Sequence, residues 1–177
     1  IVIKRKRRDK IMRIAVCPGS FDPVTNGHID IFERASGMFD LFIVGVFHNP
    51  NKKPLFTMEE RVDLLKKSTE HIKNIKIDCF RGLLNEYVRE NDYKIVVRGL
   101  RAIRDFEYEF QRALLLKKID SEIETLFMMT SNEYSFLSSS GIKELANFDG
   151  NIKGLVPEYV EIKIKQRISD LKKQMNR

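Results

Sequence analysis

The sequence predicts an α/β fold, with an open sheet of five parallel strands, helices on both faces of the sheet and further helices at the C-terminal end. Two observations carry this prediction. Short apolar segments alternate with segments of helical periodicity along the 177 residues. Residues 41–47 are also apolar throughout, which is typical of a parallel strand covered on both faces. We expect right-handed crossovers between the strands.

The first half of the chain contains three expected strands and two expected helices. Residues 13–17 form an apolar segment that ends at Pro18-Gly19, which predicts a buried strand stopped by a turn. The alternating segment 75–80 predicts an edge strand. Thr57 and Glu60 have the spacing of a helix capping box. The expected buried faces of the two helices are Ile31, Phe32, Ala35, Met38 and Phe39, and Met58, Val62, Leu65 and Ile72.

The second half continues the alternation. Residues 83–91 predict a short helix, 95–97 a buried strand, 123–129 the fifth strand and 139–148 another short helix. Pro157 suits the first turn of a last helix. The expected buried faces of the two longer helices are Phe106, Phe110, Ala113 and Leu114, and Val160, Ile164, Ile168, Leu171 and Met175.

Composition and charge exclude several classes of protein. The chain is 42% apolar and 32% charged, as in a globular protein, and no apolar run approaches the roughly 20 residues that span a bilayer. Two cysteines favour the reducing cytoplasm. Residues 1–11 carry +5 of the net charge of +7. We interpret them as a leader before a single domain of residues 12–177; the alternative is an arm that binds nucleic acid or another anionic surface.

Candidate site residues follow the expected strands, because ligands of open α/β sheets bind beyond the carboxyl ends of the strands. Residues 18–28 form a turn rich in Gly and Pro that carries Ser20 and leads to His28 at a helix start. The free amides and the dipole of such a start favour anions. The alternative is that His28 only caps or packs against the helix. Neither the P-loop pattern nor Gly-x-Gly-x-x-Gly is present, which disfavours a nicotinamide-dependent dehydrogenase.

Three further segments carry phosphate-binding side chains. Arg98 and Arg101 follow a buried strand, and arginine binds phosphate with two parallel hydrogen bonds. Lys52 and Lys53 lie in a loop between two prolines, where surface exposure alone is the alternative. Residues 138–140 are three serines at a helix start, where they can cap the helix or cradle a phosphate.

These segments, taken in order, resemble the cytidylyltransferase-type nucleotidyltransferases, whose His/Thr-x-Gly-His motif matches residues 25–28. The longer segments Gly-Ser-Phe-Asp-Pro-Val-Thr-Asn-Gly-His, Lys-Lys-Pro-Leu-Phe-Thr-Met-Glu-Glu-Arg, Arg-Gly-Leu-Arg-Ala-Ile-Arg-Asp-Phe-Glu-Tyr-Glu and Tyr-Ser-Phe-Leu-Ser-Ser-Ser resemble the bacterial phosphopantetheine adenylyltransferases. The resemblance runs from Met12 to the last helix and implies a Rossmann-like sheet. Ser20 and Tyr134 stand where the family often has Thr and Trp, which preserves a hydroxyl and an aromatic ring.

The resemblance implies that the chain transfers AMP from ATP to 4′-phosphopantetheine by direct in-line attack, which gives dephospho-coenzyme A and pyrophosphate. It implies His28, Ser20 and Lys52 as catalytic residues and Mg²⁺ as a cofactor that comes with ATP, with no protein side chain assigned as a metal ligand. It also implies a homohexamer. The expected phosphopantetheine contacts are Ser20, Lys52, Leu84 and Arg98, and the expected ATP contacts are Ser20, Phe21, His28, Gly99, Leu100, Arg101, Glu109, Tyr134, Ser135, Phe136, Leu137, Ser138, Ser139 and Ser140.

Other functions compete with this interpretation. A related transferase would act on nicotinate mononucleotide or a polyol phosphate. A nucleic-acid-binding module would use the basic segment 1–11, and a degenerate scaffold would bind nucleotide without turnover. The intact set of Ser20, His28, Lys52 and Arg98 favours an enzyme, and we expect no nucleic-acid or membrane partner.

Overall fold

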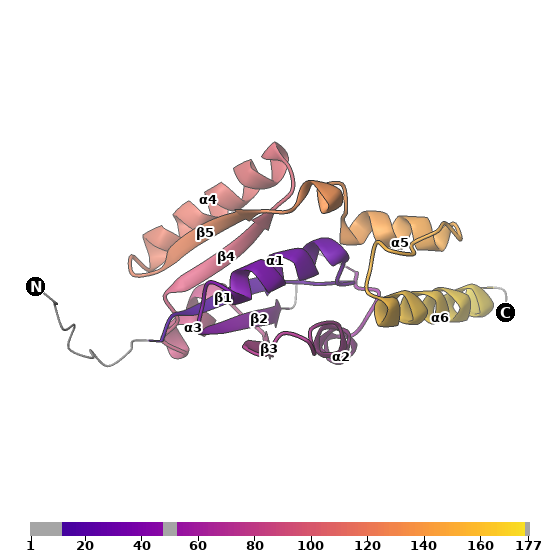
Figure 1. Cartoon of the computed structure of the whole chain (residues 1–177), viewed down its shortest axis with the longest axis horizontal. Coiled ribbons are helices and arrows are strands. Elements are labelled where there is room, and N and C mark those ends of the chain that lie inside the picture. Colours follow the sequence, from indigo (N-terminus) through magenta and orange to yellow (C-terminus); the bar gives the residue numbers. More distant parts are fainter. Residues whose placement is uncertain (1–11, 48–52, 176–177) are drawn as a thin grey trace, which may run out of the picture.

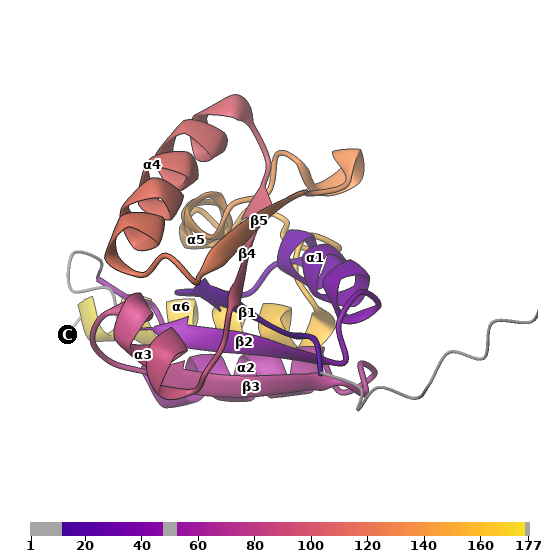
Figure 2. The ribbon, with the colours of Figure 1, turned by 90° about the vertical axis from the view of Figure 1, so that its left-hand side faces the viewer.

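The computed structural model describes residues 12–47 and 53–175, so the predictions for residues 1–11 and Lys52 lie outside the described residues. Five parallel strands form one sheet, as predicted, and their order in the sheet is β3-β2-β1-β4-β5 (Figure 1; Figure 2). The strands are β1 (Ile14–Gly19), β2 (Leu41–Phe47), β3 (Ile75–Phe80), β4 (Ile95–Leu100) and β5 (Glu124–Met129).

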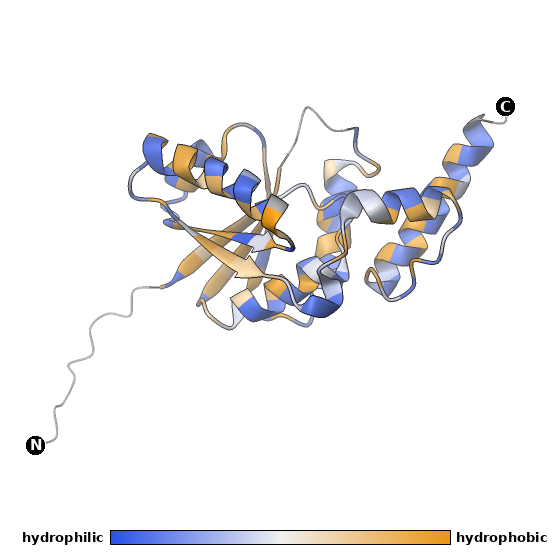
Figure 3. Cartoon of the chain, turned by 90° about the horizontal axis from the view of Figure 1, so that it is seen from above, coloured by the Kyte–Doolittle hydropathy of each residue, from blue (hydrophilic) through white to orange (hydrophobic). Residues whose placement is uncertain are grey.

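Helices cover both faces of the sheet. On one face, strand residues such as Ala15 and Val44 pack with α1 (Asn26–Ser36) and α2 (Met58–Ser68). The same core continues beyond the carboxyl ends of the strands into α5 (Ser139–Asn147) and α6 (Glu158–Met175) (Figure 1). On the other, Val16 and Ile43 pack with α3 (Leu84–Glu90) and α4 (Ile103–Ile119). Figure 3 shows hydrophobic residues along the strands, which are buried on both faces. It shows mixed colouring on the helices, which are buried on one face only.

The end of β1 differs from the prediction, because the strand continues through Pro18 and Gly19. It pairs with β2 as far as Gly19–Val46, but with β4 only at Ala15–Ile95 and Val16–Val96. The Pro18 carbonyl points to the β4 side, where it accepts a hydrogen bond from Arg98. The N–H and C=O of one residue point to the same side of a parallel strand, so an N–H at position 18 would also point to the β4 side. Because β4 has already diverged there, the missing N–H of Pro18 removes no hydrogen bond of the sheet.

This divergence lies at the point where the strand order reverses. The chain moves from β1 through β2 to β3 on one side, and then crosses to β4 and β5 on the other. Neighbouring loops leave the sheet in opposite directions at such a point, so a crevice opens at the carboxyl ends of β1 and β4.

The helix starts follow the local sequence. The predicted capping box of α2 is present, since Thr57 Oγ1 accepts from Glu60 N at 3.2 Å and Glu60 Oε2 accepts from Thr57 N at 2.8 Å. A short 3-10 turn at Asn132–Tyr134 that the periodicity did not predict precedes α5. Figure 1 shows α5 and α6 side by side, and α6 also contacts α2. No helix among the described residues is long and apolar enough to cross a membrane.

Three predicted helix faces need correction. Met38 lies beyond the end of α1, and Leu171 lies near the end of α6; both are exposed. The larger error concerns α4, where Phe106, Phe110 and Leu114 are also exposed. Asp105, Tyr108, Glu109 and Arg112 line a cavity and Leu116 is buried, so this stripe of α4 is turned toward the sheet. Of the predicted face, Phe110 and Leu114 are exposed, whereas Phe106 still contacts the Phe127 ring of β5 and Ala113 lines the second cavity.

Candidate active site

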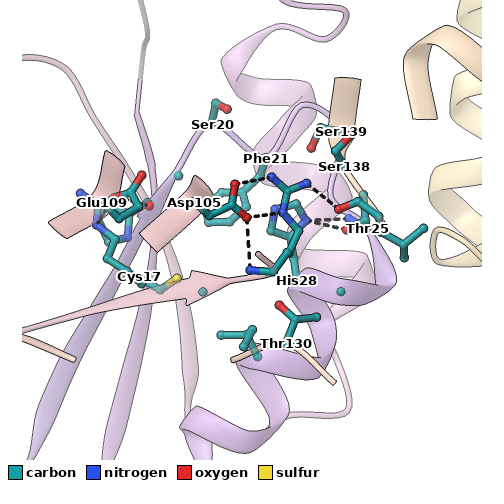
Figure 4. A pocket seen from close by; sticks show the side chains of 18 of the residues that line it. Cys17, Ser20, Phe21, Thr25, His28, Asp105, Glu109, Thr130, Ser138 and Ser139 are labelled. Atoms are coloured by element: carbon teal, nitrogen blue, oxygen red, sulfur yellow. Dashed lines mark hydrogen bonds and ion pairs between the residues drawn. The ribbon is translucent and has the colours of Figure 1, made fainter. Parts of the chain in front are cut away.

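A cavity of about 320 Å³ lies at the carboxyl ends of β1 and β4 (Figure 4). Its walls come from the turn after β1, the start of α1, the junction between β4 and α4, Thr130 after β5, and the start of α5. Three of the four predicted segments, namely residues 18–28, Arg98 with Arg101, and residues 138–140, therefore meet around one space; Lys53 does not line it. Its lining includes Ser20, Phe21, His28, Arg98, Gly99, Arg101, Glu109, Leu137, Ser138, Ser139 and Ser140.

The turn that carries Ser20 is fixed to the start of α2 by the buried side chain of Arg61. Arg61 Nη1 donates to the Ser20 carbonyl at 2.8 Å, and Arg61 Nε donates to the Thr57 carbonyl at 3.2 Å. Phe21 has a positive φ of 44°, which is unfavourable for a residue with a side chain. Its ring lies against Gly19, where an added Cβ would meet the ring at 2.5 Å. The glycine therefore permits the close approach that closes this turn.

His28 both caps α1 and faces the cavity. Thr25 N donates to His28 Nδ1 at 3.0 Å, and the Phe21 ring packs edge-on against the imidazole with centroids 5.2 Å apart. Burial, and to a smaller extent the charge of Arg101, lowers the pKa of His28 to about 4. The ring is therefore neutral at pH 7, and because Nδ1 accepts, Nε2 carries the proton. The imidazole can then donate a hydrogen bond from Nε2.

Arg101 is fixed by groups on two sides. Its Nε and Nη2 donate to the two carboxylate oxygens of Asp105 at 2.9 and 3.0 Å, and its Nη1 donates to the Leu137 carbonyl at 2.7 Å. A guanidinium has five N–H donors, so these three bonds leave two. Asp105 and Leu137 thus orient Arg101 and leave donors for a ligand.

Arg98 forms a second cationic position at the same end of the sheet. Its Nη1 donates to the Pro18 carbonyl at 3.2 Å, and its Nε lies 3.2 Å from Glu109 Oε2. That ion pair lacks hydrogen-bond geometry, so the buried Oε2 accepts no hydrogen bond from any described residue. Burial lowers the pKa of Arg98, and the charge of Glu109 opposes this effect. A guanidinium remains protonated under either influence.

The start of α5 supplies backbone amides. Ser138 caps the helix by accepting from Gly141 N at 2.9 Å, and Ser139 Oγ donates to the Pro23 carbonyl at 2.8 Å. The Ser138 hydroxyl therefore caps α5, and the Ser139 hydroxyl ties the start of α5 to the turn after β1. The first amides of a helix have no partner within the helix and attract anions.

A second cavity of about 230 Å³ adjoins the first. Its walls are mainly apolar and come from β3, α3, the C-terminal half of α4 and Thr125 of β5, with Leu84 and Leu116 among them. The two cavities share Pro18, Phe47, Arg98 and Arg112. A polar chamber and an apolar chamber thus meet at two arginines.

The site offers no cysteine nucleophile. Burial raises the pKa of the Cys17 thiol to about 12, so at pH 7 it is protonated and is not a nucleophile. Within residues 12–47 and 53–175, no group of three His, Cys, Asp or Glu side chains is placed to hold a metal ion.

Comparison with known proteins identifies the family. Residues 16–145 match the cytidylyltransferase-like family model. The phosphopantetheine adenylyltransferase of Carboxydothermus hydrogenoformans is 55% identical over 156 residues, which are 88% of this chain and 96% of that protein. Those of Dictyoglomus turgidum and Clostridium botulinum are each 56% identical, over 86% and 84% of this chain and 96% and 94% of the relatives. The chain belongs to the phosphopantetheine adenylyltransferase family.

The structure gathers most of the residues that the family resemblance implied. Of the expected ATP contacts, those outside the cavity lining are Leu100, Tyr134, Ser135 and Phe136. Leu100 is buried, Ser135 and Phe136 are exposed, and Tyr134 packs over Gly27. Their roles, like that of Lys52, stay predictions.

Sequence reasoning missed several residues of the site. Asp105, Arg112, Thr130 and Arg61 were not singled out as site residues. One signal was available for α4, because Asp105, Tyr108, Glu109 and Arg112 follow the i, i+3, i+4, i+7 spacing of one helix face. This spacing places the four polar side chains on one face of the helix, and in the structure that face lines the cavity.

Proposed function

We propose that the chain transfers the adenylyl group of ATP to 4′-phosphopantetheine, which gives dephospho-coenzyme A and pyrophosphate. The observation that carries this proposal is the joining of a cavity lined by His28, Arg98 and Arg101 to a mainly apolar cavity, at Arg98 and Arg112. A nucleotide fits the first chamber, and the thin, largely neutral pantetheine arm fits the second. The names of the relatives support the same reaction.

The polar chamber offers groups for ATP. Arg101, oriented by Asp105, and the amides at the start of α5 suit its phosphates. The buried Glu109 Oε2 has no donor among the described residues and suits a hydroxyl of the nucleotide. The acceptor would lie with its phosphate at Arg98 and its arm along Leu84.

The chemistry requires positioning more than proton transfer. The second pKa of a phosphomonoester is about 6, so the attacking group is mostly a dianion at neutral pH and needs no general base. One of its oxygens forms a bond to the α-phosphorus, and the bond from that phosphorus to the bridging oxygen breaks, so pyrophosphate leaves. Negative charge grows on the α-phosphate oxygens, where His28 Nε2 and the Ser20 hydroxyl would donate hydrogen bonds. We place Lys52 beside the incoming phosphate from the resemblance alone.

We further propose that Mg²⁺ acts with ATP. The two carboxylates of the polar chamber, Asp105 and Glu109, each face an arginine, so they form no acidic pair for a metal. This donor set fits an ion held mainly by the nucleotide phosphates and water, which is usual for Mg²⁺. The ion would neutralise charge on the phosphates and on the departing pyrophosphate.

We propose that the chain acts in the cytoplasm as a homo-oligomer, with the hexamer implied by the resemblance. The outward apolar face of α4, with Ile103, Phe106, Phe110 and Leu114 exposed, supports assembly, because such faces are normally covered. Native mass spectrometry tests this state. We expect Phe110→Glu to shift the protein to smaller species, and a wild-type monomer would contradict the proposal.

One assay tests the reaction. Pyrophosphate release is measured with ATP, Mg²⁺ and 4′-phosphopantetheine, and then with each omitted in turn. We expect release only when all three are present. Nicotinate mononucleotide and a polyol phosphate serve as alternative acceptors, and faster release with either would reject phosphopantetheine as the substrate.

A further inference from the structure

Arg112 occupies a position in the molecule that neither the family resemblance nor the proposed reaction uses. It lies on the stripe of α4 that faces the sheet and lines both cavities. Of the residues that the two cavities share, Pro18 and Phe47 are neutral, so the charged ones are Arg98 and Arg112. A ligand that extends from one chamber to the other must pass these two guanidinium groups.

The hydrogen-bonding capacity of Arg112 is unused. No residue among 12–47 and 53–175 accepts a hydrogen bond from its guanidinium, in contrast to Arg98 and Arg101. Its side chain is 42% exposed, whereas that of Arg98 is 12% exposed. Its five N–H donors are therefore available to a ligand.

Arg112 is nevertheless held in place. Its guanidinium carbon lies 5.2 Å from the centroid of the Tyr108 ring, and its Nη1 lies 3.9 Å from Glu109 Oε1. The first contact is a cation–π interaction, and the second is a weak ion pair without a hydrogen bond. Both hold the side chain at the cavity wall and leave its donors free, which is the state expected of an anion-binding arginine.

Glu109 links the two arginines. Its Oε2 faces Arg98 at 3.2 Å and its Oε1 faces Arg112 at 3.9 Å. One carboxylate therefore lies between two guanidinium groups, and the three side chains together carry a net charge of +1. An anion that reaches the junction meets two cations, of which only one can be neutralised by Glu109.

We propose that Arg112 is a second phosphate-binding residue for the acceptor substrate and that it binds the 4′-phosphate together with Arg98. This inference rests on the proposed function. The acceptor is favoured over ATP because its phosphate must lie where the apolar chamber opens into the polar one, and Arg112 lines that opening. Arg101 and the start of α5 are not among the residues that line the apolar chamber.

The test compares three proteins with wild type. Arg112→Leu removes the charge, Arg112→Lys keeps the charge but loses the planar fork, and Arg89→Leu removes an exposed arginine that lines neither cavity. Leu and Lys are good helix formers, so α4 should persist, which circular dichroism checks. Calorimetric titration is performed with 4′-phosphopantetheine, with pantetheine, which lacks the phosphate, and with ATP.

We expect Arg112→Leu to weaken 4′-phosphopantetheine binding about 10- to 100-fold, the range for a lost hydrogen bond to a charged group. Arg112→Lys should lose less and Arg89→Leu less than about 2-fold, within the range of an ordinary surface substitution. Pantetheine and ATP should bind Arg112→Leu about as they bind wild type. A loss of affinity for 4′-phosphopantetheine but not for pantetheine would show that Arg112 contacts the phosphate.

Three results would overturn the proposal: unchanged binding of 4′-phosphopantetheine to Arg112→Leu, an equal loss for pantetheine, or an equal loss for ATP. The second would assign Arg112 to the arm and the third to the nucleotide. Failure of the proposed function is seen separately, as the absence of pyrophosphate release by the wild-type protein. The titrations test only whether Arg112 contributes to the affinity for the 4′-phosphate.

Discussion

Replacement of His28 tests the central element of the proposed reaction. The imidazole is neutral because burial lowers its pKa to about 4, and its Nδ1 is occupied by Thr25 N at 3.0 Å. Its Nε2–H is thus a fixed donor that needs no reorganisation during the reaction. Loss of one such donor to a developing oxyanion costs roughly 2.7–4 kcal/mol, about 10²- to 10³-fold in kcat.

Two variants separate this role from the structural one. His28→Ala removes the donor and also leaves Thr25 N without its partner, which costs about 0.5–2 kcal/mol of stability as the loss of a helix cap. In His28→Gln the side-chain oxygen can still accept from Thr25 N, as Gln does in a capping box, but the aimed ring donor is gone. His71→Ala is the control, because His71 is exposed and pairs with Glu33 at the surface.

The assay is steady-state pyrophosphate release at saturating ATP and 4′-phosphopantetheine, with calorimetry for the affinity of each substrate. We expect both His28 variants to lose kcat by the stated factor with little change in affinity, and His71→Ala to match wild type. Near-normal kcat in a folded His28→Gln would refute the donor role. A loss in affinity as large as the loss in kcat would instead assign His28 to ground-state binding.

The remaining predictions concern Arg98, the cysteines and pH. Arg98→Ala should weaken 4′-phosphopantetheine more than ATP in calorimetry, and equal losses would reject the assignment of Arg98 to the acceptor. An alkylating reagent at pH 8 should modify the exposed Cys79 well before Cys17, whose burial raises its pKa to about 12; mass spectrometry of the native protein checks the order. The unfolded chain protonates His28 below about pH 6.5 and the folded one only below about 4, so this group should remove about 3 kcal/mol of stability as pH falls between those values. Urea unfolding of wild type and His28→Gln across that range measures the difference, and parallel curves would contradict it.

The order of strands and helices could be predicted from local patterns. The apolar run 41–47 became β2 with the predicted bounds, and the spacing of Thr57 and Glu60 gave the capping box of α2. Both signals are carried by residues close in the sequence, although β2 itself forms only by pairing with β1 and β3. The end of β1 could not be predicted in this way, because Pro18 is tolerated only where β4 has diverged.

The orientation of α4 shows the same limit. Its helical periodicity is clear, and Phe106, Phe110 and Leu114 do share one face. A hydrophobic pattern states which residues lie together but not what covers them. Here polar residues of a cavity take much of the sheet side of the helix, so Phe110 and Leu114 are exposed and Phe106 reaches the sheet only at Phe127.

The sequence by itself determined the kinds of chemical group at the strand ends, namely an imidazole, a hydroxyl, guanidinium groups and a serine-rich helix start, and the reaction that its family resemblance implies. The tertiary structure decided their states and partners. Burial makes His28 neutral, Asp105 and Leu137 orient Arg101, and Ser138 and Ser139 use their hydroxyls to hold α5. The burial of His28, the bond of Arg101 to Leu137 and the bond of Ser139 to Pro23 depend on groups from separate segments that approach one another and exclude water, and spacing along the chain does not contain that information.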